Sequence, residues 1–362
     1  MTLVPDTVAP SAQRQVWLDV LRIAAVLGVV AIHVFGGIVV APDLRGNPGW
    51  WAAVIVDIGS VWVVPAFIMV SGALILTDRE QAVGPAHFYR KRLLRLGPAF
   101  VFWQIFYIVV ARMWLTGQDI SFGGMLALVA DGNTYTHLYF LWLIVGLYAV
   151  APIVHAFLAQ GGRPRALALA GVLLVLMIAA YTAASVLTYT GSPRSISLTA
   201  FTQWLPYVGF FVAGAALNGV VLRRSRAWGV AGLGILALTA IILEYGFTAP
   251  GGLTRALLPL GYPTLLTAIT VLCLFLVLQA LLARWTPSAR MRRWLRTLSD
   301  ASFGVFLIHF VLMLLLRAAV PALADAQMRS FWAAGVVWLV VTVASFAITI
   351  AARRIPVVRR VF

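Results

Sequence analysis

The chain has 362 residues, of which 62% are hydrophobic and only 10% are charged, and its formal net charge is +16. A water-soluble domain needs a larger charged fraction, so the composition excludes that class and predicts an integral membrane protein. The single cysteine, Cys273, lies in an apolar run, which excludes both a disulfide framework and a thiolate metal site.

Apolar runs close to 20 residues long recur along the chain and predict about ten membrane-spanning helices. Their approximate extents are 17–40, 51–76, 96–115, 138–158, 166–188, 200–220, 228–247, 260–283, 301–320 and 331–352. The sixth is interrupted by polar residues and a proline, which a bundle tolerates where neighbouring helices satisfy the backbone. We expect an all-α polytopic bundle. One transmembrane domain, 17–352, would lie between a cytoplasmic N-terminal tail, 1–16, and a basic cytoplasmic C-terminal tail, 353–362.

Basic residues alternate between the two sides of this ten-helix map. Apart from Arg22, which lies inside the first span, 20 of the 27 Lys and Arg residues fall on one side. The other side has six: Arg45, Arg112, Arg194, Arg255, Arg317 and Arg329. The positive-inside rule then places both termini in the cytoplasm. Most of these arginines are expected to contact anionic membrane lipids, so no nucleic-acid partner is needed to explain the charge.

The first span carries Arg22 and His33, and ionisable groups inside a bilayer are costly enough that a functional interpretation is the default. Their separation is about three helical turns, so both side chains share one face and differ by about 16 Å in height. Asp19 lies three residues before Arg22, a spacing that allows the two to pair. The competing interpretation is a structural Arg–Asp pair and a core histidine.

The second span carries Asp57 and Ser71, which fall within roughly 40° of each other on one helical face. If the first helix rises and the second descends, Asp57 lies at the depth of His33 and Ser71 at the depth of Arg22. A carboxylate near His33 would orient the ring and support its protonated form, so that His33 acts as a general base toward a hydroxyl. A structural hydrogen-bonding role for Asp57 stays open.

A basic cluster, residues 88–98 (FYRKRLLRLGP), opens the third span from the cytoplasmic side. Arg92 and Arg95 are three residues apart and share a helix face near the membrane surface. Two guanidinium groups on a rigid helix end can bind phosphates with bidentate geometry. The cluster therefore indicates a phosphorylated cytoplasmic cosubstrate, with an ordinary positive-inside anchor as the alternative.

Two further histidines lie in or beside later spans. His137 begins the fourth span on the outer side beside Tyr139 and Trp142, an arrangement that suits either a sugar or the interfacial aromatic belt. His309 lies in the middle of the ninth span, where it either lines a buried passage through the bundle or hydrogen-bonds across helices. No grouping of His, Cys and carboxylates has metal-ligand spacing, so no metal is expected.

These residues together resemble the acyltransferase-3 family of bacterial integral-membrane O-acyltransferases, which includes inner-membrane O-acetyltransferases that act on surface polysaccharides. The resemblance covers nearly the whole chain. It rests on five motifs in the same order: Arg22 to His33 with residues 18–25 (LDVLRIAA), 64–74 (VPAFIMVSGAL), 88–98, 137–141 with 147–152 (HLYFL and LYAVAP), and 302–309 (SFGVFLIH).

The resemblance implies an enzyme of the bacterial cytoplasmic (inner) membrane that moves an acyl group, usually acetyl, from cytoplasmic acetyl-CoA to a hydroxyl of a glycan or lipid-linked glycan. Arg22 and His33 match the family's activity residues, and Arg92 and Arg95 match arginines associated with coenzyme A. We add candidates from the residues themselves: Asp57 for catalysis, Arg90 and Ser71 for the cosubstrate, and His137, Tyr139, Trp142 and His309 for the acceptor.

Two departures from the family pattern affect this expectation. No SGNH-type hydrolase domain follows the bundle, so the chain would complete the transfer alone or hand the acyl group to another protein. Residues 64–67 read VPAF in place of a more aromatic version, which would reshape the acceptor side.

The alternative function is a transporter or a flippase of a polar or lipid-linked substrate that uses the intramembrane Arg, His and Asp as its path. A receptor or scaffold with an inactive pocket is a third possibility. The acceptor, the acyl chain length, a homo-oligomeric state and the choice between direct transfer and an acyl-enzyme relay stay open.

Overall fold

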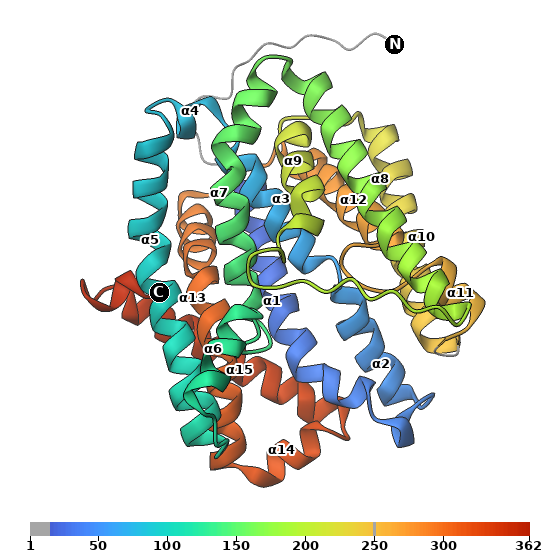
Figure 1. Cartoon of the computed structure of the whole chain (residues 1–362), viewed down its shortest axis with the longest axis vertical. Coiled ribbons are helices and arrows are strands. Elements are labelled where there is room, and N and C mark those ends of the chain that lie inside the picture. Colours follow the sequence, from blue (N-terminus) through green and yellow to red (C-terminus); the bar gives the residue numbers. More distant parts are fainter. Residues whose placement is uncertain (1–14, 249–250) are drawn as a thin grey trace.

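A computed structural model describes residues 15–248 and 251–362 (Figure 1). Secondary structure in these residues is entirely helical, so the prediction of an all-α fold is confirmed. The predicted N-terminal tail, 1–16, falls outside the described residues except for its last two positions, and so does Arg14, which contributed to the basic count.

Within the described residues, nine helices are long and apolar enough to cross a membrane, which confirms a polytopic helical bundle. They are α1 (Val16–Val39), Pro48–Ile75, Pro85–Leu115, α7 (Tyr139–Ala159), α8 (Gly162–Tyr189), α10 (Arg224–Phe247), α12 (Leu265–Leu282), α13 (Ala289–Ala319) and α15 (Phe331–Ala352). The second consists of α2 (Pro48–Asp57), the 3₁₀ turn η2 (Ile58–Ser60) and α3 (Val63–Ile75). The third consists of α5 (Pro85–Phe106) and the π-helix η3 (Tyr107–Leu115).

The expected sixth span, 200–220, differs from the prediction. Its apolar helix covers only Leu205–Leu217, formed by η4 (Leu205–Tyr207) and α9 (Val208–Leu217). At 1.5 Å per residue this is about 20 Å long, well short of a hydrocarbon core of about 30 Å. Because α9 is almost wholly buried between α3 and α8, its length is set by protein neighbours and not by lipid. The cytoplasmic placement of both termini and the domain boundaries stay predictions.

Short elements connect the long helices, and several helix starts are capped by side chains. The connecting elements are η1 (Pro42–Leu44), α4 (Asp78–Gln81), α6 (Phe122–Ala130), α11 (Leu253–Leu257), α14 (Pro321–Gln327) and η5 (Val358–Arg360). The Asn47 side chain accepts a 2.8 Å hydrogen bond from the backbone N–H of Trp50 at the start of α2. Such a cap satisfies an N–H group that has no partner inside the helix.

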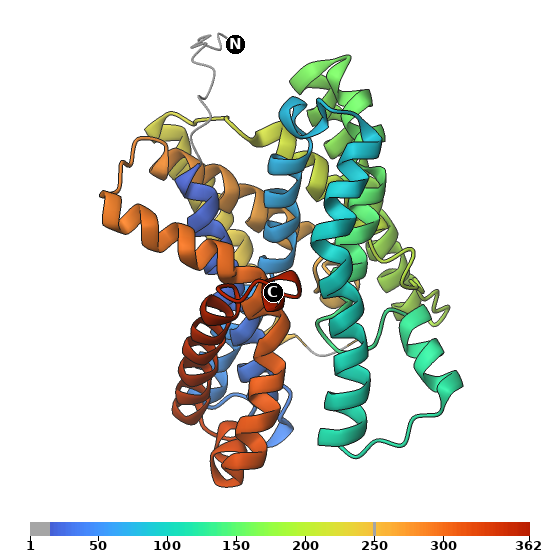
Figure 2. The same cartoon turned by 90° about the vertical axis from the view of Figure 1, so that its left-hand side faces the viewer.

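Helix α1 lies at the centre of the bundle, where it packs against α2, α3, α13 and α15 (Figures 1 and 2). Val26, Val30 and Val34 are fully buried at a spacing of four residues, so one face of α1 is enclosed over its whole length. Gln327 of α14 donates a 3.0 Å hydrogen bond to the carbonyl of Val34. Among the nine membrane-length helices of the described residues, α1 has the largest buried share, so its functional candidates are well enclosed.

Helices α3 and α9 approach each other with their backbones in contact. A methyl group added at Gly72 of α3 would overlap the carbonyl oxygen of Phe211, and one at Gly214 of α9 would overlap the carbonyl oxygen of Met69. Small residues are what allow two membrane helices to pack this closely. The glycine of the 64–74 motif is thus required by packing.

The third span changes its winding at the depth of the bundle centre. Pro98 lies inside α5, and from Tyr107 the helix continues in the π form. Single π segments are uncommon and often occur at functional sites. This one buries Tyr107, whose hydroxyl donates a 2.7 Å hydrogen bond to the carbonyl of Leu307 and so joins η3 to α13.

Candidate active site

Three histidines from distant parts of the chain meet in the interior and form what we call the histidine cluster (His33, His137 and His309). The ring centroids of His33 and His309 are 5.4 Å apart and the rings are stacked. The rings of His137 and His309 are 5.0 Å apart. His137 and His309 are buried and His33 is half-buried. Residues predicted for two different roles thus lie in one site.

The hydrogen bonding of His309 determines which of its nitrogens is available. Its Nδ1 lies 2.8 Å from the carbonyl oxygen of Phe306, and a carbonyl only accepts, so Nδ1 carries the proton. The lone pair is then on Nε2, which is buried and has no hydrogen-bond partner in the described residues. Both ring nitrogens of His137 are likewise buried and have no close hydrogen-bond partner there, although the backbone of Leu307 lies beside the ring. Polar atoms in this state are uncommon in folded proteins, and contact with a water, a ligand or a reacting group accounts for many of them.

Aromatic side chains enclose the cluster. Phe310 lies 4.4 Å from His33 and 4.9 Å from His137, measured between ring centroids. The ring of Tyr107 on the π-helix is 4.9 Å from His137. Within the described residues, no Asp, Glu, Lys or Arg is hydrogen-bonded to any of the three imidazoles. The cluster is therefore surrounded by imidazole and aromatic rings, with no charged side chain hydrogen-bonded to it in the described residues.

Asp57 and Arg22 both lie on elements that adjoin the cluster. Asp57 is buried at the end of α2 and packs beside Gly36 of α1: a methyl group at Gly36 would lie 3.6 Å from the Asp57 Oδ2. Gly36 is about one turn beyond His33 on α1. No hydrogen bond joins Asp57 to His33 in the described residues, so the expected direct orientation of the ring is absent from this structure. Arg22 is half-buried on α1, with Asp19 buried one turn before it.

The basic cluster of residues 88–98 forms a structured site around Arg92, which we call the arginine clamp (Arg92, Glu80, Phe88 and Tyr148). The Arg92 guanidinium is ion-paired with Glu80 of α4 and lies 5.3 Å and 5.6 Å from the ring centroids of Phe88 and Tyr148. Only 11% of its side chain is exposed, and its Nε is buried without an acceptor in the described residues. Arg92 is therefore fixed in place and keeps one unused donor.

Glu80 is held in its charged form by its surroundings. Its partial burial alone would raise its pKa, but the hydrogen bond from Lys91 and the charges of Arg92, Lys91 and Arg79 together hold the pKa of Glu80 below its ordinary value of 4.5. Lys91 Nζ lies 3.0 Å from the carboxylate. The clamp is thus a preassembled arrangement of charges at the end of α5.

The other candidates for cosubstrate binding are more open. Arg95 and Arg90 are exposed on α5, one turn and half a turn from Arg92. Ser71 is half-buried on α3. None of these three side chains forms a hydrogen bond or ion pair in the described residues. The structure thus separates one buried arginine from two exposed ones, although the sequence pattern makes them look alike.

Tyr139 and Trp142 lie on α7 but belong to different surroundings. The Tyr139 hydroxyl lies beside the hydroxyls of Tyr207 and Tyr262. Trp142 packs against Phe100 and Phe201 with ring centroids 4.7 Å and 5.5 Å apart, and its Nε1 is buried without a partner in the described residues. The predicted group of His137, Tyr139 and Trp142 therefore does not form one contact set.

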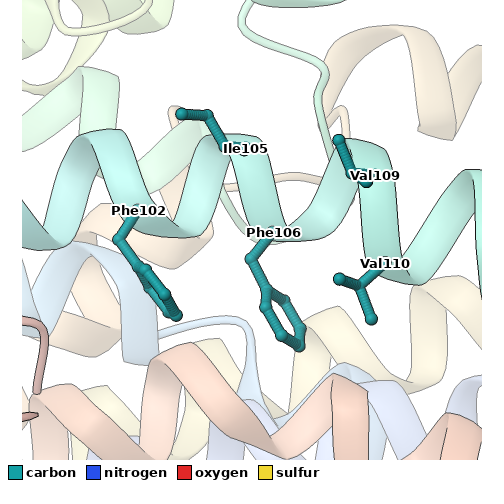
Figure 3. A pocket seen from close by; sticks show the side chains of 5 residues that line it. All are labelled: Phe102, Ile105, Phe106, Val109 and Val110. Atoms are coloured by element: carbon teal, nitrogen blue, oxygen red, sulfur yellow. The ribbon is translucent and has the colours of Figure 1, made fainter.

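A cavity of about 270 Å³ lies along α5 and η3 (Figure 3). Only apolar side chains line it: Phe102, Ile105, Phe106, Val109 and Val110. Such a lining matches hydrocarbon and offers no group to orient a polar acceptor. Within the described residues there is also no group of three or more His, Cys, Asp or Glu arranged to hold a metal ion.

The interior site contains residues that the sequence analysis did not select. Tyr107 and Phe310 contact the cluster, and Gln104 lies one turn before Tyr107 with a buried, unpartnered Nε2. Gln104 is a polar residue in the middle of a predicted span, and that signal was available in the sequence. The aromatic residues carried no comparable signal because the chain is rich in them throughout.

The model of the acyltransferase-3 family, described as an acyltransferase domain, matches residues 15–354. This chain belongs to that family. The match covers almost all of the 362 residues and includes both the histidine cluster and the arginine clamp. No curated protein and no solved structure matches the chain. The protein is thus a multi-pass membrane protein of an acyltransferase family, and its donor and acceptor are matters of proposal.

Proposed function

We propose that the protein transfers an acyl group, most simply acetyl, from cytoplasmic acyl-CoA to a hydroxyl of a cell-envelope glycan or lipid-linked glycan in the bacterial inner membrane. The observation that carries this proposal is the histidine cluster. Its three imidazoles lie among aromatic rings, and ring nitrogens of two of them are not used by the fold. Acyl transfer to a hydroxyl needs a base in a site from which water is excluded.

In the proposed step, His33 removes the proton of the acceptor hydroxyl while the hydroxyl oxygen attacks the thioester carbonyl. The new C–O bond forms, the C–S bond breaks, and the protonated His33 returns its proton to the departing coenzyme A thiolate. His309, whose ring stacks on His33, offers its Nε2 lone pair to a neighbouring proton. A relay through a transient acyl-His33 is the alternative route.

The proposed cosubstrate site is the cytoplasmic rim. Arg92 and Arg95, with Arg90 beside them, would bind the phosphates of coenzyme A. The rise along the third span from Arg92 to Tyr107 is about 22 Å, so the pantetheine arm must extend inward from the rim to the cluster. Arg22 would lie beside this arm, and Ser71 is the remaining candidate along it.

Glu80 is already ion-paired with the Arg92 guanidinium. A phosphate that binds Arg92 therefore has to share this guanidinium with the Glu80 carboxylate. The unused Nε of Arg92 and the exposed Arg95 supply the additional donors. These features support a site that binds a phosphorylated ligand by charge while remaining neutralised in its absence.

The test is the thermal unfolding of the purified protein with acetyl-CoA, with free coenzyme A and with neither. A ligand that binds only the folded state raises apparent stability, by about 2.7 kcal/mol at a hundredfold excess over Kd. We expect both ligands to raise the midpoint and acetyl-CoA to be consumed when native membranes are added. No shift with either ligand would exclude the donor and favour the transport function. Mass spectrometry of envelope glycans from a deletion strain and its parent would then identify the acceptor.

A further inference from the structure

A second cavity, of about 250 Å³, lies on the side predicted to face away from the cytoplasm. We call it the tyrosine cavity, and it is lined by Asn133, Tyr139, Tyr181, Leu198, Gln203, Tyr207 and Pro263. These residues come from α7, α8, η4 and three connecting loops that converge at this point. One of these loops is tied to the end of α6, because the backbone N–H of Ala200 donates a 3.0 Å hydrogen bond to the carbonyl of Ala130.

The lining has a specific chemistry. Three tyrosine rings offer flat apolar faces with polar edges, two carboxamides offer donors and acceptors, and no lining side chain is charged. An acidic or cationic ligand would find no counter-ion in such a cavity. A ligand with several hydroxyls and apolar C–H faces would satisfy both parts of the lining, and this combination describes a sugar ring.

The side-chain amide of Gln203 has a fixed orientation and an unused acceptor oxygen. Its Nε2 donates a 2.9 Å hydrogen bond to the carbonyl of Asp131, which fixes the orientation of the amide. Its Oε1 is buried and accepts no hydrogen bond in the described residues. A buried acceptor without a donor is costly, so an O–H group from a ligand would be stabilising at this position.

The cavity is linked to the histidine cluster through one short segment. Tyr139 lines the cavity and His137, two residues earlier, lies in the cluster. Two residues of chain span at most about 7 Å. A sugar in the cavity would therefore lie next to the short segment that carries His137.

We propose that the tyrosine cavity is the acceptor site and that it takes a neutral sugar or other polyol unit. This inference rests on the proposed acyl transfer, in which the donor binds at the cytoplasmic rim and the acceptor reaches the bundle from the other side. It differs from the sequence-based group of His137, Tyr139, Trp142 and His309, of which only Tyr139 lines this cavity.

The test introduces a cysteine at the cavity and blocks it from outside. In a Cys273→Ala background, Leu198→Cys is compared with Ser195→Cys, which lies exposed in the same loop and does not line the cavity. Spheroplasts carrying each variant in place of the native gene are treated with sulfonatoethyl methanethiosulfonate, a thiol reagent that does not cross membranes. Mass spectrometry measures the modified fraction, and two rates are recorded: acetyl incorporation into envelope material and thioester cleavage of acetyl-CoA.

We expect modification of Leu198→Cys to lower acetyl incorporation at least about tenfold, because the adduct fills the acceptor volume, while modification of Ser195→Cys has little effect. Binding of acetyl-CoA by modified Leu198→Cys protein should be unchanged. Full modification of Leu198→Cys with undiminished incorporation would overturn the cavity assignment. Absence of both thioester cleavage and incorporation in the unmodified protein would instead overturn the proposed function. Identification of the acylated unit as an amine or an acidic sugar would refute the neutral class.

Discussion

The histidine cluster contacts the third span at Tyr107, the arginine clamp lies near the start of that span, and the two differ in composition. The cluster contains imidazoles among aromatic rings with no charged partner in the described residues, whereas the clamp contains an arginine that is ion-paired and stacked. A buried reacting group is useful when its lone pair is not already engaged. A group that binds a charged ligand is useful when it is held in place and the ligand can replace its ion-pair partner. Under the proposed function, cosubstrate binding and proton transfer would take place at different positions along the third span.

The largest expected effect is on acyl transfer and tests the histidine cluster alone. His33→Ala should lower acyl transfer by about 10²- to 10⁴-fold, the usual contribution of a general base, while acetyl-CoA binding stays nearly unchanged. Transfer is followed with radiolabelled acetyl-CoA, and binding by calorimetry on the same preparation. His87→Ala is the matched control, because His87 is exposed on α5 and outside the cluster. Normal turnover in folded His33→Ala protein would refute both direct attack and the relay.

The next effect tests the rim. Replacing Arg92 or Arg95 by Ala should weaken acyl-CoA binding by about 1.5 to 3 kcal/mol, since a charge-assisted hydrogen bond to phosphate is lost. Lys should substitute poorly wherever the contact is bidentate. Arg359→Ala, an exposed basic residue near the C-terminus, provides the control for a general loss of positive charge. If the Arg92/Arg95 double variant bound acyl-CoA as tightly as the wild type, these arginines would not be the cosubstrate site.

The third prediction concerns the packing of α3 against α9. Gly72→Ala should lower the free energy of unfolding by about 1 to 3 kcal/mol or more, because the added methyl overlaps a backbone oxygen that cannot move aside easily. The control is Gly335→Ala in α15, where a methyl meets nothing within 4 Å and should be neutral or slightly stabilising. Thermal unfolding in detergent measures both. Equal midpoints for the two variants would contradict the close approach of α3 and α9.

A smaller effect sharpens the description of the clamp. Glu80→Gln keeps the shape of the side chain but removes the carboxylate that competes with phosphate for Arg92. We expect acyl-CoA binding to tighten a few-fold, as measured by titration at constant ionic strength. Weaker binding would mean that Glu80 serves mainly to hold Arg92 in its binding position.

The smallest effect is a pH dependence with a defined sign. The folded protein lowers the pKa of Glu80, so its carboxylate contributes stability above its ordinary value of 4.5, and this contribution is lost as pH falls through the lower folded pKa. The difference in unfolding midpoint between wild type and Glu80→Gln should therefore be constant from about pH 8 to pH 6 and shrink only in acid. A change in that difference around neutral pH would contradict the assignment.

The sequence predicted the helical class and most spans well, because apolar runs of membrane length have few competing interpretations. It overestimated the sixth span, where composition could not reveal that α9 is buried between protein neighbours. Among the candidate residues, His33 and His309 were conspicuous as ionisable groups in apolar helices, but their contact joins α1 to α13 and depends on tertiary packing. No sequence period or motif indicates that Arg92 pairs with Glu80 across a turn. The π-helix that buries Tyr107 likewise has no sequence signal.

The reciprocal glycine contacts between α3 and α9 also restrict how the bundle can move. Each helix has a carbonyl oxygen seated where the other lacks a side chain, so a sliding step along the interface would bring an oxygen against a neighbouring β-carbon. Packed interfaces of this kind shift between discrete arrangements and do not deform continuously. Helices α3 and α9 are therefore expected to move together as one rigid unit. Any hinge motion of the bundle is expected outside that unit.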